Sequence, residues 1–216
     1  MTMPAILFSQ MLPPEDRVDD FHHWYNTDHV PVRMVLPGFI GARRFESIEE
    51  PGSFLAVYDL ENLAALTTPE YDLVKRAPTA VTDEMLGLVE GFTRFTCEQA
   101  ADEGEATLGP YLFVVAFTVP EADEGEFNRW YDDEHVPLLL KARDWLRVRR
   151  YVVSDGAGGP WTHLALHELA SLEVLDSPER EVARTGPLRE PLVGLPWFQQ
   201  SGRWLYREIA RVHARS

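Results

Sequence analysis

The chain is poor in cysteine and in positive charge. Its 216 residues include one cysteine, Cys97, and 20 basic side chains against 35 acidic ones, so its formal net charge is −15. A single cysteine excludes an internal disulfide and a cysteine-based metal cluster. A surface this acidic repels phosphate groups, so we expect neither a nucleic acid nor a membrane as a partner.

Long apolar runs are missing as well, since no segment approaches the roughly 18 residues needed to span a bilayer. The start, Met1-Thr2-Met3-Pro4, lacks the charged and apolar regions of a secretory signal. Hydrophobic residues nevertheless make up 45% of the chain and aromatic residues 11%, which is enough for a globular core. These features predict a cytoplasmic globular protein.

The sequence contains an internal repeat. A shift of 106 positions aligns residues 24–31 (Trp-Tyr-Asn-Thr-Asp-His-Val-Pro) with residues 130–137 (Trp-Tyr-Asp-Asp-Glu-His-Val-Pro), and five of the eight positions are identical. After a three-residue insertion in the turn 155–160, the offset becomes 109. We therefore predict two ferredoxin-like repeats, at 1–100 and 108–216, joined by a polar stretch.

Both repeats have the same predicted order of elements, β-α-β-β-α-β. The predicted strands are 5–11, 40–47, 53–60 and 91–98 in the first repeat and 111–119, 146–153, 161–169 and 200–208 in the second. The first helix of each repeat, near 16–28 and 121–134, should end at its Val-Pro step. The second helices should begin at Thr68-Pro69 and Ser177-Pro178, where a capping residue precedes a proline.

This order of elements is that of the ferredoxin-like fold. Its strands are apolar on both faces, although one repeat alone covers only one face of its sheet with helices. Two repeats can bury the other faces by closing one barrel with helices outside. The predicted fold class is therefore α+β, with tandem ferredoxin-like βαββαβ repeats forming a single-chain pseudo-dimeric α/β barrel.

The repeated motif suggests a family. Trp-Tyr-x-x-(Asp/Glu)-His-Val-Pro, followed by Leu36-Pro37-Gly38-Phe39 and an arginine-bearing strand, resembles the EthD-like branch of the dimeric α/β-barrel superfamily. That superfamily includes cofactor-free isomerases, decarboxylases, dehydratases, polyketide cyclases, quinone-forming monooxygenases and haem-handling enzymes, alongside members with no assigned activity. The second repeat reads Ala142-Arg143-Asp144 where the first has Leu36-Pro37-Gly38, so the repeats need not carry equivalent sites.

His29 and His135 are the first catalytic candidates. Each is predicted in the last turn of a helix, where the helix dipole favours the imidazolium form. An imidazole there can move a proton on a bound carbon acid or enol, and the resemblance implies that this histidine faces a cavity. The alternative is a structural role, in which each histidine ties the helix end to a strand carbonyl or to the preceding acidic residue.

Aromatic residues of the same helices are candidate substrate-binding residues. Trp24, Tyr25, Trp130 and Tyr131 can line an aromatic pocket, with the tyrosine hydroxyls orienting a substrate oxygen. The alternative is packing, because Phe21, Trp24 and Tyr25 follow the spacing of an ordinary core stripe.

Adjacent arginines on the second strand of each repeat must point to opposite faces, so one of Arg43 and Arg44, and one of Arg149 and Arg150, faces inward. A buried guanidinium requires a carboxylate or an anionic ligand. We predict that Arg43 and Arg149 hold an acidic group of the substrate. The alternative is an internal ion pair with Asp59 or Glu168 on the adjacent strand.

The third strands differ between the repeats. His163 and His167 share a strand face in the second repeat, where the first has Phe54 and Tyr58. We predict His163 and His167 as catalytic, Phe54 and Tyr58 as substrate-binding, and both pairs as facing one composite cavity. No third ligand completes a metal set, so no metal is predicted; one axial histidine could bind haem, but nothing in the sequence selects it.

The sequence has no GxGxxG after a strand, no Walker-type loop and no GxSxG elbow, which disfavours nucleotide cofactors and serine hydrolysis. The leading hypothesis is a cofactor-independent isomerase or lyase that acts on a small hydrophobic, aromatic or polyketide-like carbonyl compound, as a monomer or homodimer. A cofactor-free or haem-dependent monooxygenase and a non-catalytic binding or assembly protein are the alternatives.

Overall fold

The computed structural model describes residues 2–213, and within them eight strands are hydrogen-bonded in the order β1-β3-β2-β8-β5-β7-β6-β4, which closes a barrel. The predicted α+β fold class is confirmed. The chain divides into two compact units, and each is described by itself. Within residues 2–213, no helix is long and apolar enough to cross a membrane.

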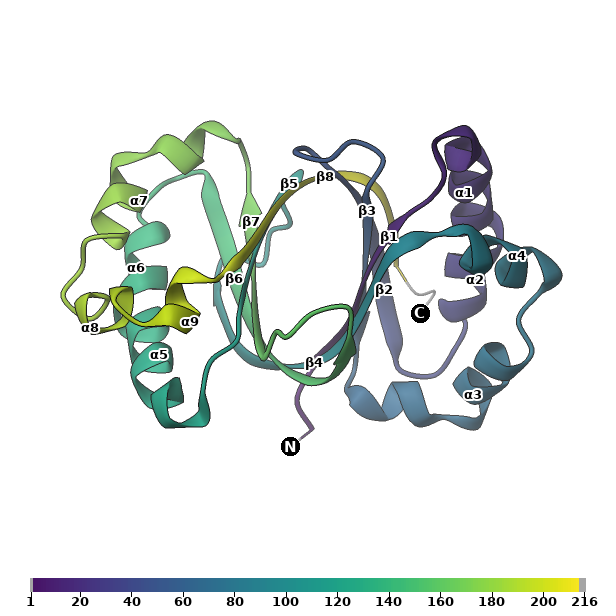
Figure 1. Cartoon of the computed structure of the whole chain (residues 1–216), viewed down its shortest axis with the longest axis horizontal. Helices are drawn as coiled ribbons and strands as arrows, with labels where there is room; N and C mark the ends of the chain where they lie inside the picture. Colours follow the sequence, from purple (N-terminus) through teal and green to yellow (C-terminus); the bar gives the residue numbers. More distant parts are fainter. Residues whose placement is uncertain (1, 214–216) are drawn as a thin grey trace. The chain divides into compact units, whose positions relative to one another are not determined.

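Unit 1 comprises the described parts of Met1–Glu98, Ser154–Gly159 and Glu208–Ser216. Its helices lie on one side of its strands (Figure 1). Its elements are β1 (Ala5–Leu12), η1 (Glu15–Arg17), α1 (Val18–Trp24), η2 (Tyr25–His29), α2 (Val30–Arg33), β2 (Phe39–Ser47), β3 (Phe54–Leu60), η3 (Leu63–Thr67), α3 (Pro69–Arg76), α4 (Ala80–Leu88) and the first part of β4 (Glu90–Gly104).

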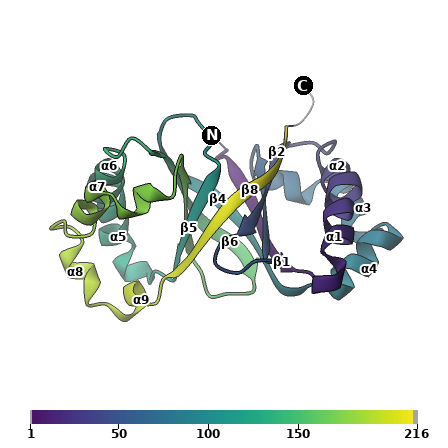
Figure 2. The ribbon, with the colours of Figure 1, turned by 90° about the horizontal axis from the view of Figure 1, so that it is seen from above.

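Unit 2 comprises Gln99–Val153 and Pro160–Arg207. Helices α5 to α9 lie on one side of its strands (Figure 2). Its elements are β5 (Tyr111–Phe117), η4 (Glu121–Asp123), α5 (Glu124–Trp130), η5 (Tyr131–His135), α6 (Val136–Leu139), β6 (Trp145–Ala157), β7 (His163–Leu169), η6 (Glu173–Asp176), α7 (Pro178–Ala183), α8 (Glu190–Val193), α9 (Pro196–Gln199) and β8 (Gly202–His213).

The compact units and the sequence repeats do not have the same ends. Residues 154–159, from β6 and the turn after it, belong to unit 1, as does the last part of β8 from residue 208 onward. Strand β4 begins in unit 1 and ends in unit 2. Strands β4, β6 and β8 therefore each have one part in unit 1 and the other part in unit 2.

The first strand of each repeat is central in its unit. Strand β1 pairs with β3 and β4, and β5 pairs with β7 and β8, all antiparallel. Seven of the eight residues of β1 are buried, which agrees with the apolar pattern on both faces of this segment. The predicted caps are also present, because the Thr68 hydroxyl accepts from the Tyr71 amide and the Ser177 hydroxyl from the Arg180 amide.

The expectation that each Val-Pro step ends a helix is wrong. In both repeats the helix passes through one π turn, η2 or η5, and continues into α2 or α6. The Val30 amide donates to the carbonyl of Tyr25, five residues earlier, and the Val136 amide donates to that of Tyr131. A π turn interrupts the regular ladder, so the missing N–H of the following proline and its clash with the preceding turn are tolerated there.

Each unit has its own hydrophobic core between sheet and helices. In unit 1, Phe21 stacks on Phe54 at 5.2 Å between ring centroids and meets Tyr25 edge-on at 4.9 Å. In unit 2, Phe127 packs in the same way against Tyr131 at 5.3 Å. These clusters fix the helices carrying the repeated motif against the strands.

Candidate functional site

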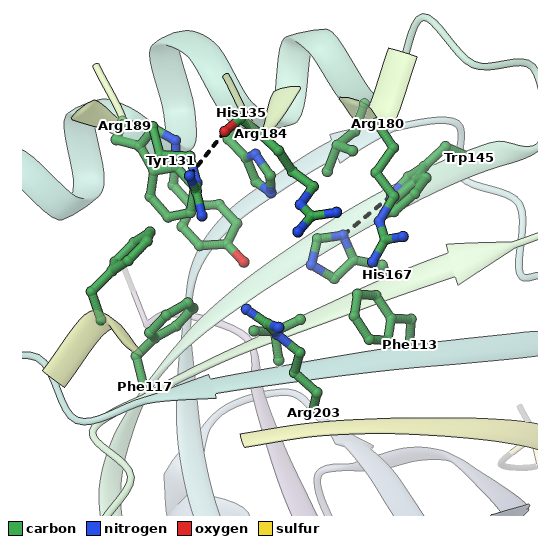
Figure 3. A pocket seen from close by; sticks show the side chains of 14 residues that line it. Phe113, Phe117, Tyr131, His135, Trp145, His167, Arg180, Arg184, Arg189 and Arg203 are labelled. Atoms are coloured by element: carbon green, nitrogen blue, oxygen red, sulfur yellow. Dashed lines mark hydrogen bonds between the residues drawn. The ribbon is translucent and has the colours of Figure 1, made fainter. Parts of the chain in front are cut away.

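A cavity of about 70 Å³ lies between the strands and helices of unit 2 (Figure 3). Aromatic and aliphatic side chains form most of its wall, while two histidines, one tyrosine and four arginines supply its polar groups. Its lining residues are Phe113, Val115, Phe117, Trp130, Tyr131, His135, Leu139, Trp145, His167, Arg180, Arg184, Arg189, Phe198 and Arg203. The π turn η5 contributes the first and last of its own residues, Tyr131 and His135, to this cavity.

The hydrogen bond of His135 determines its tautomer. Its Nδ1 lies 3.0 Å from the carbonyl oxygen of Ala183, and a carbonyl only accepts, so Nδ1 carries the proton. Burial, with a smaller contribution from Arg189 and Arg180, lowers the pKa of His135 to about 4, so the ring is neutral at pH 7. The remaining nitrogen, Nε2, is therefore a lone-pair acceptor on a ring that lines the cavity.

His167 has the opposite arrangement. The indole Nε1 of Trp145 donates to its Nδ1 at 3.2 Å, and an indole N–H only donates, so the proton of this imidazole is on Nε2. Burial lowers the pKa of His167 well below its ordinary value, with the His135 ring contributing further. The buried Nε2 has no hydrogen-bond partner among the described residues. One cavity thus has a basic nitrogen on His135 and an unpartnered N–H donor on His167.

The four arginines make the cavity strongly cationic. Arg180 donates to the carbonyl of Leu175 and Arg189 donates to that of Arg184 at 2.9 Å, which fixes both side chains without neutralising them. Burial lowers the pKa of Arg180 and of Arg189, and repulsion from Arg184 and Arg203 lowers it further. In the described part of the chain, no acidic side chain lines the cavity. Mutual repulsion of these guanidinium groups therefore favours an anionic ligand.

Figure 3 shows the Arg184 and Arg203 side chains reaching toward the rings of His167 and Tyr131. The Arg184 guanidinium is 3.2 Å from the exposed carboxylate of Glu181. Within residues 2–213, the Arg203 side chain makes no hydrogen bond or ion pair. The Tyr131 ring is held from its other side by Arg150, whose guanidinium carbon lies 4.6 Å from the ring centroid. Burial raises the pKa of Tyr131, so its hydroxyl is a hydrogen-bond donor at neutral pH.

The acidic residue of the repeated motif, Glu134 in unit 2, binds the backbone at residues 188–189. The Glu134 carboxylate is buried and accepts from the amides of Leu188 and Arg189 at 3.0 and 3.2 Å. In unit 1, the equivalent Asp28 accepts from two threonine hydroxyls, of Thr79 and Thr82. Glu134 therefore fixes the backbone from which Arg189 extends into the cavity.

This anchor leaves no room for a side chain at Gly186. A Cβ added there would overlap the Glu134 carboxylate, whereas one added at Gly194 of the same segment meets nothing within 4 Å. We expect Gly186→Ala to lower the free energy of unfolding by about 1–3 kcal/mol, the usual cost of overpacking, and to weaken anion binding. Urea denaturation checks the first effect, with Gly194→Ala as the matched control. Equal stabilities of the two variants would contradict the anchor.

Several predicted site residues lie together in the units, and others do not. Trp130, Tyr131, His135 and His167 line the cavity of unit 2, while Tyr25, His29 and Tyr58 line a second cavity, in unit 1. The others pack in the cores: Trp24 donates to Thr82 at 2.8 Å, Phe54 stacks on Phe21, and His163 contacts Phe127 and lies 2.9 Å from the Thr162 hydroxyl.

The four residues predicted to face one composite cavity belong to two different units. Phe54 and Tyr58 belong to the core of unit 1, whereas His167 lines the cavity of unit 2 and His163 packs against the α5 ring of Phe127 in the same unit. The reason is the direction of the strand face that these residues share, which in each repeat points at its own helices.

Arg43 and Arg149 were predicted to hold an acidic substrate group, but they are not among the residues lining either cavity. Arg43 Nε donates to the Glu208 carboxylate at 2.8 Å, and Arg149 pairs with Glu168 of the neighbouring strand β7 at 3.5 Å. Both guanidinium groups are almost completely buried, and a carboxylate compensates the charge that burial would otherwise leave unpaired. For Arg149 the internal ion pair is the alternative considered above.

The sequence reasoning missed the arginines of the α7–β8 region. At the offset of 109, Arg180, Arg184 and Arg189 correspond to Tyr71, Lys75 and Ala80. An excess of arginine confined to one repeat of an acidic protein was a usable signal. It was not specific, because nothing in the pattern told which side of these short helices would face the strands.

Burial of neutral histidines makes stability sensitive to acid. Burial lowers the pKa of both His135 and His163 from an ordinary 6.5 to about 4. Between these values the unfolded chain binds protons that the folded chain does not, so the free energy of unfolding falls as the pH falls from about 6.5 toward 4. For His135 the difference corresponds to about 3 kcal/mol.

We expect urea denaturation to show a clear loss of stability between pH 6.5 and 5, where most carboxylates remain ionised. His163→Gln removes one of the titrating groups and should reduce the slope of stability against pH in that range. An unchanged slope in His163→Gln would mean that folding does not lower the pKa of this imidazole.

Clusters of three or more His, Cys, Asp or Glu suited to a metal are absent from residues 2–213.

Comparisons with known proteins bear on the fold. No family model matches the sequence, and no curated protein matches it. An anthrone oxidase-like protein aligns over 100% of this chain and 95% of its own length, with a TM-score of 0.70 and 10% identity. A candidate monooxygenase from Fusobacterium nucleatum aligns over 98% and 95%, with a TM-score of 0.68 and 8% identity. A chlorite dismutase from Candidatus Nitrospira defluvii aligns over 96% and 91%, with a TM-score of 0.57 and 11% identity.

These likenesses show the fold. The chain has the ferredoxin-like architecture of the dimeric α/β barrels, and its structural neighbours include monooxygenase-like and chlorite dismutase-like proteins. At such low identity they carry no reaction over to this chain. The narrower EthD-like assignment stays a prediction from the motif.

Proposed function

We propose that unit 2 is an acid–base active site of the isomerase or lyase kind, which moves a proton on a compact carbonyl acid. The observation that carries the proposal is the pairing of opposite tautomers. His135 Nε2 is a neutral acceptor, His167 Nε2–H is an unpartnered donor, and both rings line a cavity with four arginines. In acid–base catalysis at a carbonyl, a basic nitrogen removes the proton and an N–H donor stabilises the developing oxyanion.

The charge of the cavity supports an anionic substrate. Guanidinium groups bind carboxylates and enolates through parallel charge-assisted hydrogen bonds, and a bound anion would relieve the repulsion among the arginines. At about 70 Å³ the cavity is smaller than the roughly 150 Å³ of a cavity that accepts benzene. The proposed substrate is therefore a short oxo acid, or the acidic end of a longer molecule that leaves through the exposed rim at Arg184 and Arg203.

The proposed step is a proton transfer from carbon. His135 Nε2 takes a proton from the carbon next to the carbonyl. The electron pair of that C–H bond forms a carbon–carbon double bond, while the π pair of the C=O bond moves to oxygen and gives an enolate. His167 Nε2–H and the Tyr131 hydroxyl donate hydrogen bonds to this oxygen while arginine holds the carboxylate. Burial and, to a smaller extent, the neighbouring arginines lower the pKa of His135. The negative charge of a bound substrate opposes the effect of the arginines and makes the nitrogen a stronger base.

The unit 2 cavity does not fit haem. Pockets for drug-sized ligands measure about 300–1,000 Å³, and the cavity beside His135 and His167 is about 70 Å³. His167 Nδ1 is also already engaged by Trp145.

Exchange of carbon-bound hydrogen tests the proposal. The protein is incubated in D₂O with pyruvate, 2-oxobutyrate, oxaloacetate or acetoacetate, and loss of the proton signal next to the carbonyl is followed by NMR. We expect exchange above the buffer rate with at least one of these acids and none with the corresponding methyl ester, which lacks the charge. Equal exchange of acid and ester, or none with any acid, would contradict the proposal.

A further inference from the structure

Unit 1 contains a cavity at the position that corresponds to the unit 2 site. It measures about 320 Å³. At the offsets of 106 and 109, ten of its lining residues correspond to residues lining the unit 2 cavity. Among these, Tyr25 and His29 of the π turn η2 correspond to Tyr131 and His135. The two cavities therefore occupy equivalent positions in the two units.

The polar groups of the unit 1 cavity are different. Tyr58 replaces His167 and Tyr71 replaces Arg180. The Arg94 guanidinium is retained but donates to the Tyr71 hydroxyl at 3.3 Å, and Asp83 lines the same cavity. Three cations, Arg33, Lys75 and Arg94, line the cavity together with the Asp83 carboxylate. Two of the cations are already engaged, because Arg33 donates to the carbonyl of His29 at 2.9 Å and Arg94 to the Tyr71 hydroxyl. Tyr58 and Tyr71 add uncharged phenol groups to this lining.

Two buried polar atoms of this cavity lack partners. Among the described residues, neither the Tyr58 hydroxyl nor His29 Nδ1 makes a hydrogen bond, although the two side chains are only 1% and 5% exposed. An unsatisfied buried polar group is costly and uncommon. The apolar wall, with Leu7 and Met11 on β1, leaves a ligand as the natural partner of these atoms.

We propose that unit 1 binds an uncharged, planar aromatic compound bearing a hydroxyl or carbonyl oxygen, which is held by the Tyr58 hydroxyl and the His29 imidazole. The phenol donates to, or accepts from, the ligand oxygen, and the aromatic rings of Tyr25 and Tyr71 pack against its plane. Burial lowers the pKa of His29 well below its ordinary value, so this imidazole meets the ligand in its neutral form. The chain then carries two different ligand sites, and this second one does not depend on the reaction proposed for unit 2.

The probe is 2-naphthol, with 2-naphthoate as its charged counterpart, in calorimetric titrations of the whole protein. We expect wild type to bind 2-naphthol and Tyr58→Phe to bind it about tenfold more weakly, as the loss of one hydrogen bond predicts. Because the Tyr58 hydroxyl has no partner in the protein, the melting temperature of Tyr58→Phe without ligand should equal or exceed that of wild type. His29→Gln provides the second variant, and it should also weaken 2-naphthol binding.

Arg203→Gln, which alters only the unit 2 cavity, should leave 2-naphthol binding unchanged, and this separates the two sites. The proposal is overturned if 2-naphthol does not bind at millimolar concentration, if Tyr58→Phe binds it as tightly as wild type, or if 2-naphthoate binds more tightly than 2-naphthol in a Tyr58-dependent way. Weakening by Arg203→Gln instead of Tyr58→Phe would place the compound in unit 2 and would also overturn it.

Discussion

Replacing His135 with glutamine is expected to slow proton exchange on the carbonyl acid by about 10²- to 10⁴-fold, the usual contribution of a positioned general base. Glutamine retains an N–H that can donate to the Ala183 carbonyl, as His135 Nδ1 does at 3.0 Å. It does not supply the basic nitrogen. The melting temperature should therefore stay within a few degrees of wild type while NMR exchange is lost.

His163→Gln is the matched control for His135→Gln. The sequence alone predicted His163 as catalytic, but its ring packs on Phe127 and lies beside the Thr162 hydroxyl, outside the residues that line the cavity. We expect its exchange rate to remain within about threefold of wild type under conditions where the variant is folded. Similar losses in His135→Gln and His163→Gln would indicate a structural role for both histidines and would remove the proposed base.

Replacing Arg203 with glutamine is expected to raise the KM for the acidic substrate by about 10- to 100-fold, with a smaller change in kcat. One charge-assisted hydrogen bond to a carboxylate contributes about 1.5–3 kcal/mol. Arg203 is the cleanest of the four arginines to remove, because within residues 2–213 it makes no hydrogen bond or ion pair that its loss would break. Steady-state kinetics over a range of salt concentrations provides the measurement, since salt should raise the wild-type KM.

The matched control is Arg76→Gln. This arginine lies on α3 with 80% of its side chain exposed and pairs only with Asp72 of the same helix. Its replacement changes the net charge by the same amount, but Arg76 is not among the residues lining either cavity. An equal rise of KM in Arg76→Gln would mean that the overall field of the protein, rather than the cavity, attracts the anion.

The fold was predictable from the sequence because it rests on patterns that repeat. The motif Trp-Tyr-x-x-(Asp/Glu)-His-Val-Pro recurs at a fixed offset, and strands apolar on both faces require cover on both sides. The Val-Pro step misled the prediction of the helix ends. Proline ends a regular helix, but the π turns η2 and η5 interrupt the ladder just before it.

Candidate site residues were predictable only in part. Residues predicted from the repeated motif line a cavity, whereas those predicted from strand alternation do not. Tyr131 and His135 follow from a motif with helical spacing, which places both on one side of the turn. Arg43 and Arg149 were chosen because a buried guanidinium needs an anion, and the structure supplies that anion internally through Glu208 and Glu168. Strand alternation shows that a side chain points inward, but it does not show what it meets there.

By itself, the sequence of this protein determined the duplication, the order of elements in each repeat and the motif that carries one tyrosine and one histidine per repeat. These are local or periodic properties, written in residues close together in the chain. Only the tertiary structure decided that His135 and His167 are neutral with opposite tautomers, because their partners, Ala183 and Trp145, lie 48 and 22 residues away. The same holds for the four arginines around them: short helices bring their side chains to one cavity, and no spacing in the chain specifies that convergence.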